Sequence, residues 1–365
     1  MKVCAPFRYP HWNEVSAVPM NSDLLEMYFM NTKSRKPLEF TDPLGRNHYK
    51  SISRFEINSE DTCLLICGNV QRWTHPLNKG KIPYTGIHDK IFTGHTTGYS
   101  PWDQVDMVEL ALMKFDNPEN NLGTNGIYLM PNKFFRRFIS IDWRIDKYKK
   151  LKDDIFRGLD KKTIILCDYE PFQYWIDNIP RRVDRRDPDT IGVALNWSQF
   201  QTRSNLEKIR EDLIRINRST GKRIHIKYHN SYKKDFESFT KDLDFIVHTR
   251  FEDLDKFTFM DMYETYIVDA TGFGYELAHR VRRFNDDVSI FYFDGLEASR
   301  DEFLGVEEMG VVPTKTHEDL IKGSTKSWYP LGVVEESFPY SDSVFVPDEL
   351  CKVILLSINQ LKENK

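Results

Sequence analysis

The stretch TIGVALNWSQFQTRSNLEKIREDLIRINRSTGKRIHIKYH, residues 190–229, decides the fold class. Its apolar run at 190–195 predicts a buried strand, the apolar spacing over 204–216 predicts an amphipathic helix, and the run at 223–229 predicts a second strand. A helix that joins two short buried strands is typical of a parallel sheet with crossover helices. The sequence therefore predicts an α/β protein.

The same alternation continues toward the C-terminus. Further strands are expected at 245–251, 265–270 and 288–293, with helices at 234–243, 259–264 and 274–284. A last helix is expected over 348–361, where the apolar residues form a single stripe. Because an open parallel sheet binds ligands beyond the carboxyl ends of its strands, functional residues are expected directly after these strands.

The N-terminal half is less regular. Strands are expected at 1–7, 61–69, 90–94 and 163–169, and helices at 106–115 and 146–159. Long segments rich in Asn, Pro and Gly, at 30–50 and 115–133, are expected to be irregular loops. The segment IPRRVDRRDPDT, residues 179–190, has no apolar periodicity and is interpreted as an interdomain linker.

Composition excludes several classes of protein. The 365 residues include 51 Lys and Arg, 55 Asp and Glu, and 25 Phe, 17 Tyr and 7 Trp, which is too aromatic for a disordered chain. No apolar run reaches the roughly 18 residues of a membrane span, and the start MKVCAPFRYPHW lacks a signal peptide, so a cytoplasmic location is expected. The five cysteines include no CxxC, which argues against a disulfide framework and a structural zinc site.

The strongest local motif is VDATGFGYELAHR, residues 268–280. A strand that ends at Asp269 is followed by a Gly-containing turn and a helix, so free backbone N–H groups at the helix start can bind a phosphate. Glu276, early in this helix, can accept hydrogen bonds from a ribose. Donor-binding residues are expected at Asp269, Thr271, Gly272, Phe273, Gly274 and Glu276. The alternative is a Gly-containing turn without a ligand.

The GxG in this motif is compatible with three nucleotide-using families. A dinucleotide-binding fingerprint requires GxGxxG in the first βαβ unit, and a methyltransferase motif normally opens its domain. Here the motif follows the fourth of five expected strands of the second half. Phosphate binding by a glycosyltransferase fits this order best.

Two histidine segments supply candidate catalytic residues. In KRIHIKYHNS, residues 222–231, His229 follows a strand, and His225 and Lys227 alternate with isoleucines, which indicates two different sheet faces. In FTGHTTGYSPWDQ, residues 92–104, His95 is a candidate base with Asp103 as its orienting carboxylate. The alternative for each is a histidine with a purely structural or solvated role.

At these residues the chain resembles a GT-B glycosyltransferase. The second half is similar to the CDP-glycerol glycerophosphotransferase family: IKYHN matches its KxHP motif, VDATG loosely matches its TDYSS motif, and GHTTG loosely matches its WHGTP motif. No proline follows His229, and Thr271 and Gly272 replace the paired serines. The stretch 272–277 also resembles the DNA α-glucosyltransferase of T-even phages.

The resemblance implies two Rossmann-like domains that face each other across a cleft. It implies an acceptor-binding domain at 1–180, a linker at 181–190, a nucleotide-donor domain at 191–345, and a C-terminal helix at 346–365 that packs back on the first domain. It also implies catalytic roles for His95, Asp103 and His229, with Lys227 and Arg250 neutralising the leaving phosphate.

The expected function is transfer of a sugar from a nucleotide sugar to a hydroxyl acceptor. Residues 133–227 contain 23 Lys and Arg against 14 acidic residues, which makes double-stranded DNA with hydroxymethylated pyrimidines one acceptor to consider, and would place the protein in a phage-infected host. The alternatives are a polyol phosphate transferase for a cell-surface polymer, an epimerase that needs no acceptor, and a non-catalytic nucleotide binder.

No cofactor or metal is required, because fixed cations and a helix dipole can stabilise the leaving diphosphate. Among the aspartate pairs at DxD spacing, only Asp253 and Asp255 follow an expected strand. We interpret them as a solvated surface pair.

Overall fold

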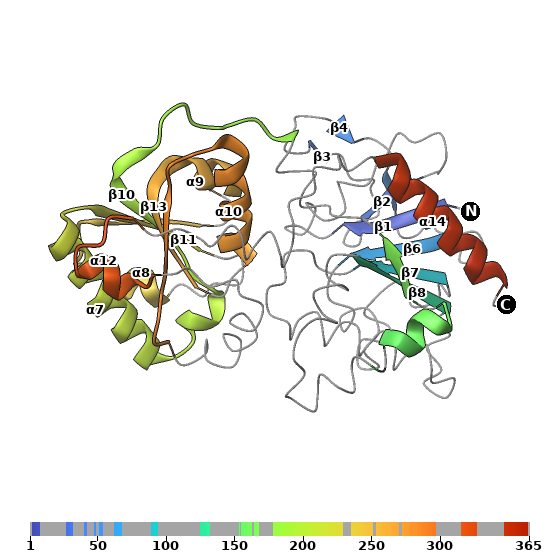
Figure 1. Cartoon of the computed structure of the whole chain (residues 1–365), viewed down its shortest axis with the longest axis horizontal. Coiled ribbons are helices and arrows are strands. Elements are labelled where there is room, and N and C mark those ends of the chain that lie inside the picture. The colour runs from blue at the N-terminus through green and yellow to red at the C-terminus, as the bar shows by residue number, and fades with distance from the viewer. Residues whose placement is uncertain are drawn as a thin grey trace. The chain divides into compact units, whose positions relative to one another are not determined.

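The structure is a computed structural model. It describes residues 2–7, 27–31, 40–41, 47–48, 51–53, 62–67, 89–93, 125–131, 153, 155–162, 164–167, 178–228, 235–250, 253–269, 272–296, 315–326 and 347–363. The chain divides into two compact units, drawn as ribbons in Figure 1. Among the described residues, one unit contains 2–167 with the C-terminal helix, and the other contains 179–326. The two units are considered separately below.

The first unit is built on a parallel sheet. Its strands are β1 (Lys2–Phe7), β2 (Met27–Asn31), β5 (Ser51–Ser53), β6 (Thr62–Cys67), β7 (Asp89–Thr93), β8 (Asn125–Pro131) and β9 (Ile164–Cys167). They lie in the order β5-β2-β1-β6-β7-β8-β9, and all neighbours pair in parallel. A separate short hairpin joins β3 (Phe40–Thr41) to β4 (Asn47–His48).

The expected irregular loops at 30–50 and 115–133 are wrong in part. They overlap the end of β2, the β3–β4 hairpin and the whole of β8. β8 reads NGIYLMP, and its buried Ile127 and Leu129 share one face between two neighbouring strands. A central strand flanked by Asn and Pro resembles a turn-rich loop in sequence, which explains the error. The expected helix at 106–115 lies outside the described residues.

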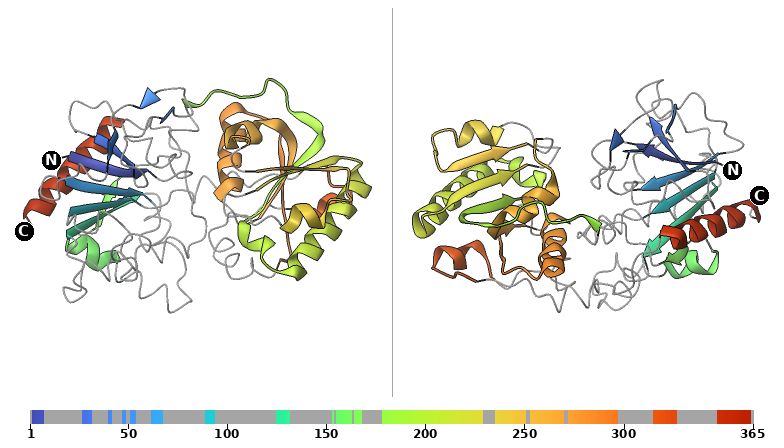
Figure 2. Two further views of the ribbon diagram at one scale, coloured as in Figure 1. Left: turned by 180° about the vertical axis from the view of Figure 1, so that it is seen from behind. Right: turned by 90° about the horizontal axis from the view of Figure 1, so that it is seen from above.

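The C-terminal helix α14 (Pro347–Glu363) belongs to the first unit. It contacts β7, β8 and β9, and its inner stripe consists of Ile354, Ile358 and Leu361, all of which are buried. Figure 2 shows it alongside the sheet of this unit from two directions. The prediction that this helix packs back on the first unit is confirmed.

The second unit contains the parallel sheet predicted from residues 190–229. Its strands are β10 (Asp187–Ala194), β11 (Arg223–Lys227), β12 (Ile246–Thr249), β13 (Tyr263–Val268) and β14 (Ser289–Tyr292). The sheet order is β12-β11-β10-β13-β14. In order along the chain this is third, second, first, fourth, fifth, which is the Rossmann arrangement, and the order reverses between β10 and β13.

Helices cover both faces of this second sheet (Figure 1). One face carries α7 (Arg203–Thr220), α8 (Asp235–Phe239) and α12 (His317–Ile321), and the other carries α9 (Lys256–Met262) and α10 (Gly272–Phe284). A short 3-10 helix, η4 (Trp197–Phe200), follows β10. The α7 helix begins at its N-cap Thr202, whose hydroxyl accepts from the Asn205 N–H, and ends at Gly221 with a left-handed φ of 69°.

The segment expected to be a linker is held by the second unit. β10 already begins at Asp187, and the buried Arg186 donates to the carbonyls of Met260 and Tyr263 at 2.6 and 3.0 Å. Arg280 donates to the carbonyls of Ile179 and Pro180 at 3.2 and 2.9 Å. These hydrogen bonds therefore fix residues 179–186 to the second unit.

Candidate functional site

The candidate site lies at the carboxyl edge of the second sheet, where the strand order reverses. Polar groups from the ends of β10 and β13 meet there. The backbone N–H of Asn196 donates to both carboxylate oxygens of Asp269, at 3.0 and 2.9 Å. Asp269 is buried, and its contact ties the loop after β10 to the end of β13. Asp269 thus shapes the crevice in which an open α/β sheet binds its ligand.

The helix α10 begins three residues later, at Gly272. The first four N–H groups of a helix have no partner within the helix, and this first turn contains no acidic side chain. These amides carry the positive end of the helix dipole and are suited to a phosphate. The structure thus describes the helix that follows the predicted phosphate-binding turn, and phosphate binding there stays a prediction.

Phe273 contributes to this turn through its backbone. Its ring packs with Phe259 and Tyr266, with ring centroids 5.6 and 6.5 Å away, in an aromatic cluster under α9. Gly274 is buried. The half-buried Phe273 ring therefore packs within the protein, so any contact with a ligand is expected from its backbone.

The predicted cations Lys227 and Arg250 differ in environment. Lys227 is buried at the end of β11, and its ammonium donates to the carbonyl of Leu254 just before α9. Arg250 is exposed, and its Nε lies 4.0 Å from a carboxylate oxygen of Glu237. A hydrogen-bonded buried ammonium has a fixed position, whereas an exposed guanidinium with one distant partner can reorient toward a ligand.

Glu276 is buried in the first turns of α10 and forms an ion pair that the sequence did not predict. Both of its carboxylate oxygens accept from the Lys256 ammonium, at 3.0 and 2.9 Å. Lys256 is the first residue of α9, so the pair joins the starts of α9 and α10 at the carboxyl edge. In the sequence, Lys256 is one lysine in a polar segment. It lies beside Glu276 only because β13 connects α9 to α10 and places the starts of both helices at the same edge of the sheet.

Four predicted site residues lie outside the described residues: His95, Asp103, His229 and Thr271. Their roles stay predictions. The backbone neighbours of two of them are described. Tyr228 precedes His229, its N–H donates to the Thr249 carbonyl at 3.0 Å, and Gly272 follows Thr271 as the first residue of α10.

Two histidines of the second sheet, the buried His225 and the half-buried His248, lie outside the predicted catalytic set. His225 contacts the hydroxyls of Tyr263 and Thr249, the latter at 2.5 Å from Nε2, and burial, with the Lys227 and His248 charges, lowers its pKa to about 4. His248 contacts the hydroxyls of Tyr228 and Thr240 at 2.7 and 3.0 Å, and burial lowers its pKa too. The predicted difference between the two faces of β11 is confirmed, since His225 and Ile224 pack on opposite sides.

Two of the carboxylates that could hold a metal, those of Asp255 and Asp212, are already bonded within the protein. Asp255 caps α9 by accepting from the N–H groups of Phe257 and Thr258 at 2.8 and 3.2 Å. Asp212, His317 and Glu318 lie within ligand distance of one another. Lys208 and Arg215 contact Asp212 at 2.9 and 2.7 Å, so this acidic group already has cations.

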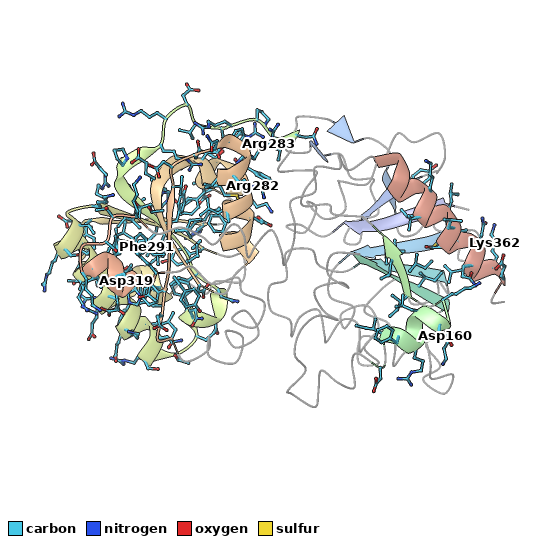
Figure 3. The ribbon with its side chains drawn as sticks, in the orientation of Figure 1. Asp160, Arg282, Arg283, Phe291, Asp319 and Lys362 are labelled. Atoms are coloured by element: carbon cyan, nitrogen blue, oxygen red, sulfur yellow. The ribbon has the colours of Figure 1, made fainter. Side chains whose placement is uncertain are left out.

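The arginines of segment 179–190 are only partly free to bind a polyanion. Arg181 and Arg186 both pair with Asp286, and burial lowers the pKa of Arg186. Arg282 and Arg283 lie in the last turn of α10, where Figure 3 labels them. Among the helices that the structure describes, none is long and apolar enough to span a membrane.

Comparison with known proteins identifies the fold. No protein-family model and no curated protein sequence matches the chain. Among solved structures, the chain is similar to the UDP-GlcNAc 2-epimerase from Neisseria meningitidis bound to UDP-GlcNAc, with a TM-score of 0.52 at 11% identity over 99% of this chain and 100% of that one. The Methanocaldococcus jannaschii UDP-GlcNAc 2-epimerase, in complex with UDP-GlcNAc and UDP, gives 0.50 at 12% identity over 98% and 99%.

At this level of identity the similarity shows the fold alone. That fold is the α/β architecture of the GT-B class, with one parallel sheet in each unit, as predicted from the sequence.

Proposed function

We propose that the chain is an enzyme that binds a nucleotide sugar at the carboxyl edge of the β10–β14 sheet. The observation that carries the proposal is the start of α10 immediately beyond β13, where the Rossmann-ordered sheet reverses. Free amides at a helix start bind phosphate in many folds, and here Lys227 and Lys256 add two cations near the same edge. The solved structures of similar fold that contain UDP-GlcNAc or UDP support this proposal.

In the proposed site, the amides of Gly272, Phe273 and Gly274, with the Thr271 hydroxyl, bind the diphosphate. Lys227, His229 and Arg250 supply positive charge for the leaving group, Asp269 shapes the crevice, and Glu276 accepts from the ribose hydroxyls. Fixed dipoles and cations aimed at developing negative charge stabilise such a transition state without a metal.

The proposed reaction is sugar transfer to a hydroxyl acceptor, with His95 as the base and Asp103 as its orienting carboxylate in the first unit. A general base removes the acceptor proton as the oxygen attacks the anomeric carbon, and the nucleoside diphosphate leaves. The second candidate is epimerisation of the sugar while it is bound to the nucleotide, because both solved structures described above are epimerases of this fold.

Two kinds of acceptor are compared for the transferred sugar. A cell-surface polymer and DNA with hydroxymethylated pyrimidines are the two acceptors that the sequence resemblance suggests. The pairing of Arg181 and Arg186 with Asp286 removes charge that DNA binding would use. We therefore give the polymer priority.

Product analysis separates the candidates. The protein is screened by thermal shift against nucleoside diphosphates and nucleotide sugars, since a ligand at 100 times its dissociation constant adds about 2.7 kcal/mol of stability. A bound nucleotide sugar is then incubated with and without acceptor. Release of nucleoside diphosphate indicates sugar transfer, and release of nucleoside monophosphate from CDP-glycerol indicates polyol phosphate transfer.

An inverted sugar centre in an intact nucleotide sugar would indicate an epimerase. Binding with no turnover of any kind would indicate a non-catalytic binder. The matched variant is Gly272→Val, which should abolish nucleotide binding by blocking backbone approach while unfolding remains cooperative. Unchanged binding in the folded variant would remove α10 from the site. Activity that survives chelation by EDTA would support the proposed metal-free mechanism.

A further inference from the structure

A second helix start lies at the same edge of the sheet as that of α10. The helix α7 follows β10 through η4, and β10 is the strand next to β13 where the strand order reverses. Ligands of such sheets bind in the crevice at this point. Residues 201–204, at the start of α7, are exposed, so this helix start reaches the surface.

The first turn of α7 favours an anion. It contains no acidic side chain, and its N–H groups carry the positive end of the helix dipole. The Thr202 hydroxyl accepts from the Asn205 N–H at 3.3 Å, whereas the N–H of the first residue, Arg203, has no partner within the helix. Every helix has such a start, so a binding site requires a second observation.

That observation is the side chain of Gln199 in η4. It is fully buried, and its Oε1 accepts from the Nδ2 of Asn205, in the first turn of α7, at 3.3 Å. Its Nε2 has no hydrogen-bond partner among the described residues. Because Oε1 and Nε2 share one carbon atom, this donor also lies against the first turn. A buried donor without an acceptor is rare in folded proteins, because it has lost its bonds to water without replacement.

The amide of Gln199 can turn toward a ligand at little cost. The last torsion of a Gln side chain has a broad energy minimum, and the neighbouring residues 201–204 are exposed. The Nε2 atom breaks no hydrogen bond when it turns. Arg203 adds a cation at the same turn, since its side chain is 84% exposed and pairs with Glu207 at the surface.

We propose that the Gln199 amide and the start of α7 form a second phosphate subsite of the candidate site. The inference rests on the proposed function for the identity of the ligand, because phosphates are the groups of its substrates that offer only hydrogen-bond acceptors. A phosphate suits side-chain and backbone N–H donors at a helix start. It belongs either to the donor or to an acceptor that carries a phosphate, such as a polyol phosphate polymer.

The test compares Gln199→Met with the full-length wild type. Met is an unbranched side chain without an amide, so the change removes the unpartnered donor together with the contact to Asn205. We expect a urea midpoint equal to or above that of the wild type, because loss of an unsatisfied buried donor offsets loss of one neutral hydrogen bond. Phosphate affinity should fall roughly 10-fold or more in calorimetric titrations, the usual effect of one hydrogen bond to a charged group.

Two probes distinguish the sources of the phosphate. One is whichever of UDP, CDP, GDP and ADP binds the wild type most tightly, and the other is glycerol 3-phosphate, added once that nucleotide is saturating. Weaker nucleotide binding in Gln199→Met assigns the subsite to the donor, and weaker glycerol 3-phosphate binding assigns it to the acceptor. If Gln199→Met does not fold, the same affinities are measured in Gln199→Glu, which keeps an oxygen for Asn205 and replaces the donor by an acceptor.

The matched control is Asn217→Leu, at the other end of α7. The Nδ2 of Asn217 has a partner, the Lys222 carbonyl, at 2.8 Å. This variant should lose stability and keep both affinities under conditions where it is folded. The opposite responses of two amides distinguish a ligand-binding role from a structural one.

The outcomes separate this inference from the proposed function. Unchanged affinity for both probes in the folded variant overturns the subsite, and a lowered urea midpoint would then indicate that an internal water bonds the Gln199 amide. Glycerol 3-phosphate that binds the wild type and not Gln199→Met, with no nucleotide bound by either, overturns the proposed function and supports the subsite. Failure of the wild type to bind either probe overturns both.

Discussion

The two faces of the second sheet bury different kinds of side chain. The α7 face is mainly apolar: β10 and β11 place Ile191, Val193, Ile224 and Ile226 in one core with Ile209, Leu213 and Ile216 of α7 and with aromatic side chains such as Phe236 and Phe291. The face under α9 and α10 carries His225 and Tyr266 beside aromatic residues of α9. The α7 face therefore mainly stabilises the sheet, whereas the face under α9 and α10 also positions polar groups at the candidate site.

Two ion pairs lie on the face of the sheet under α9 and α10. Between α9 and α10, Arg280 pairs with Asp261 and Lys256 pairs with Glu276, and both cations lie over the ring of Phe257, at 5.3 and 5.2 Å. Buried pairs recover little more than the cost of removing their charges from water. We infer that these contacts fix the relative position of the two helix starts rather than supply most of the stability.

The largest expected effect comes from breaking the fully buried pair of the polar face. Arg280→Met leaves Asp261 with the Arg182 N–H and with Arg186 at 3.9 Å, but without its bidentate partner, whose contacts are 2.7 Å long. Removing one partner of a buried pair typically costs about 3 to 5 kcal/mol. Urea unfolding should show this loss, with Arg203→Ala as the control, since Arg203 pairs with Glu207 on the exposed surface of α7. A wild-type midpoint in Arg280→Met would refute the comparison.

A substitution on the α7 face should lower the stability of the protein without altering its affinity for nucleotide. Leu213 is fully buried in α7, and Leu213→Ala is expected to cost about 3 kcal/mol, within the range for buried Leu to Ala changes. Under conditions where the variant is folded, its nucleotide affinity should match the wild type. Loss of affinity out of proportion to the unfolded fraction would mean that the two faces are coupled more closely than their packing indicates.

Sequence patterns predicted the second sheet because its strands and helices are regular and local. The stretch 190–229 contains two buried apolar runs and one amphipathic helix, and they became β10, α7 and β11. The first unit was harder, because β2 and β8 lie in segments whose Asn, Pro and Gly content resembles that of loops. Parallel pairing is made by residues far apart in sequence, so such strands carry little local signal.

The candidate site likewise has features that the sequence predicted and features that it did not. The helix start at Gly272 could be predicted, because a strand, a Gly-containing turn and a helix follow one another directly. The partner of Glu276 could not, since Lys256 lies 20 residues away across β13. The same holds for Asp269, whose partner Asn196 is 73 residues distant. Motifs reveal contiguous features, whereas ion pairs across a sheet edge require the topology.

A smaller effect is expected where the polar face has no room for a side chain. A Cβ on Gly192 of β10 would lie 2.6 Å from ring atoms of Tyr266, and the Tyr266 hydroxyl is held by the Phe259 carbonyl at 2.5 Å. Gly192→Ala must displace this ring, which typically costs about 1 to 3 kcal/mol. The double variant with Tyr266→Leu should lose less than the sum of the two single changes. Strict additivity in denaturant unfolding would show that the ring is not the obstacle.

The smallest expected effect is a pH dependence of stability that arises from His225 on the face under α9 and α10. The pKa of His225 is lowered to about 4, mainly by burial, from an ordinary value of about 6.5, so the unfolded chain binds a proton between these values that the folded chain does not. Stability should therefore fall as the pH drops from about 6.5 toward 4, by up to about 2 kcal/mol at pH 5.

His225→Gln removes this proton difference while keeping an amide that can bond the Tyr263 and Thr249 hydroxyls. The variant should consequently lose less stability than the wild type between pH 7 and pH 5, as measured by urea midpoints at both pH values. Leu213→Ala serves as the control, because it lowers stability without removing a titrating group, and its pH 7 to pH 5 difference should equal that of the wild type. A difference in His225→Gln as large as in the wild type would show that His225 is not kept neutral in the folded protein, and that the acid sensitivity comes from other groups.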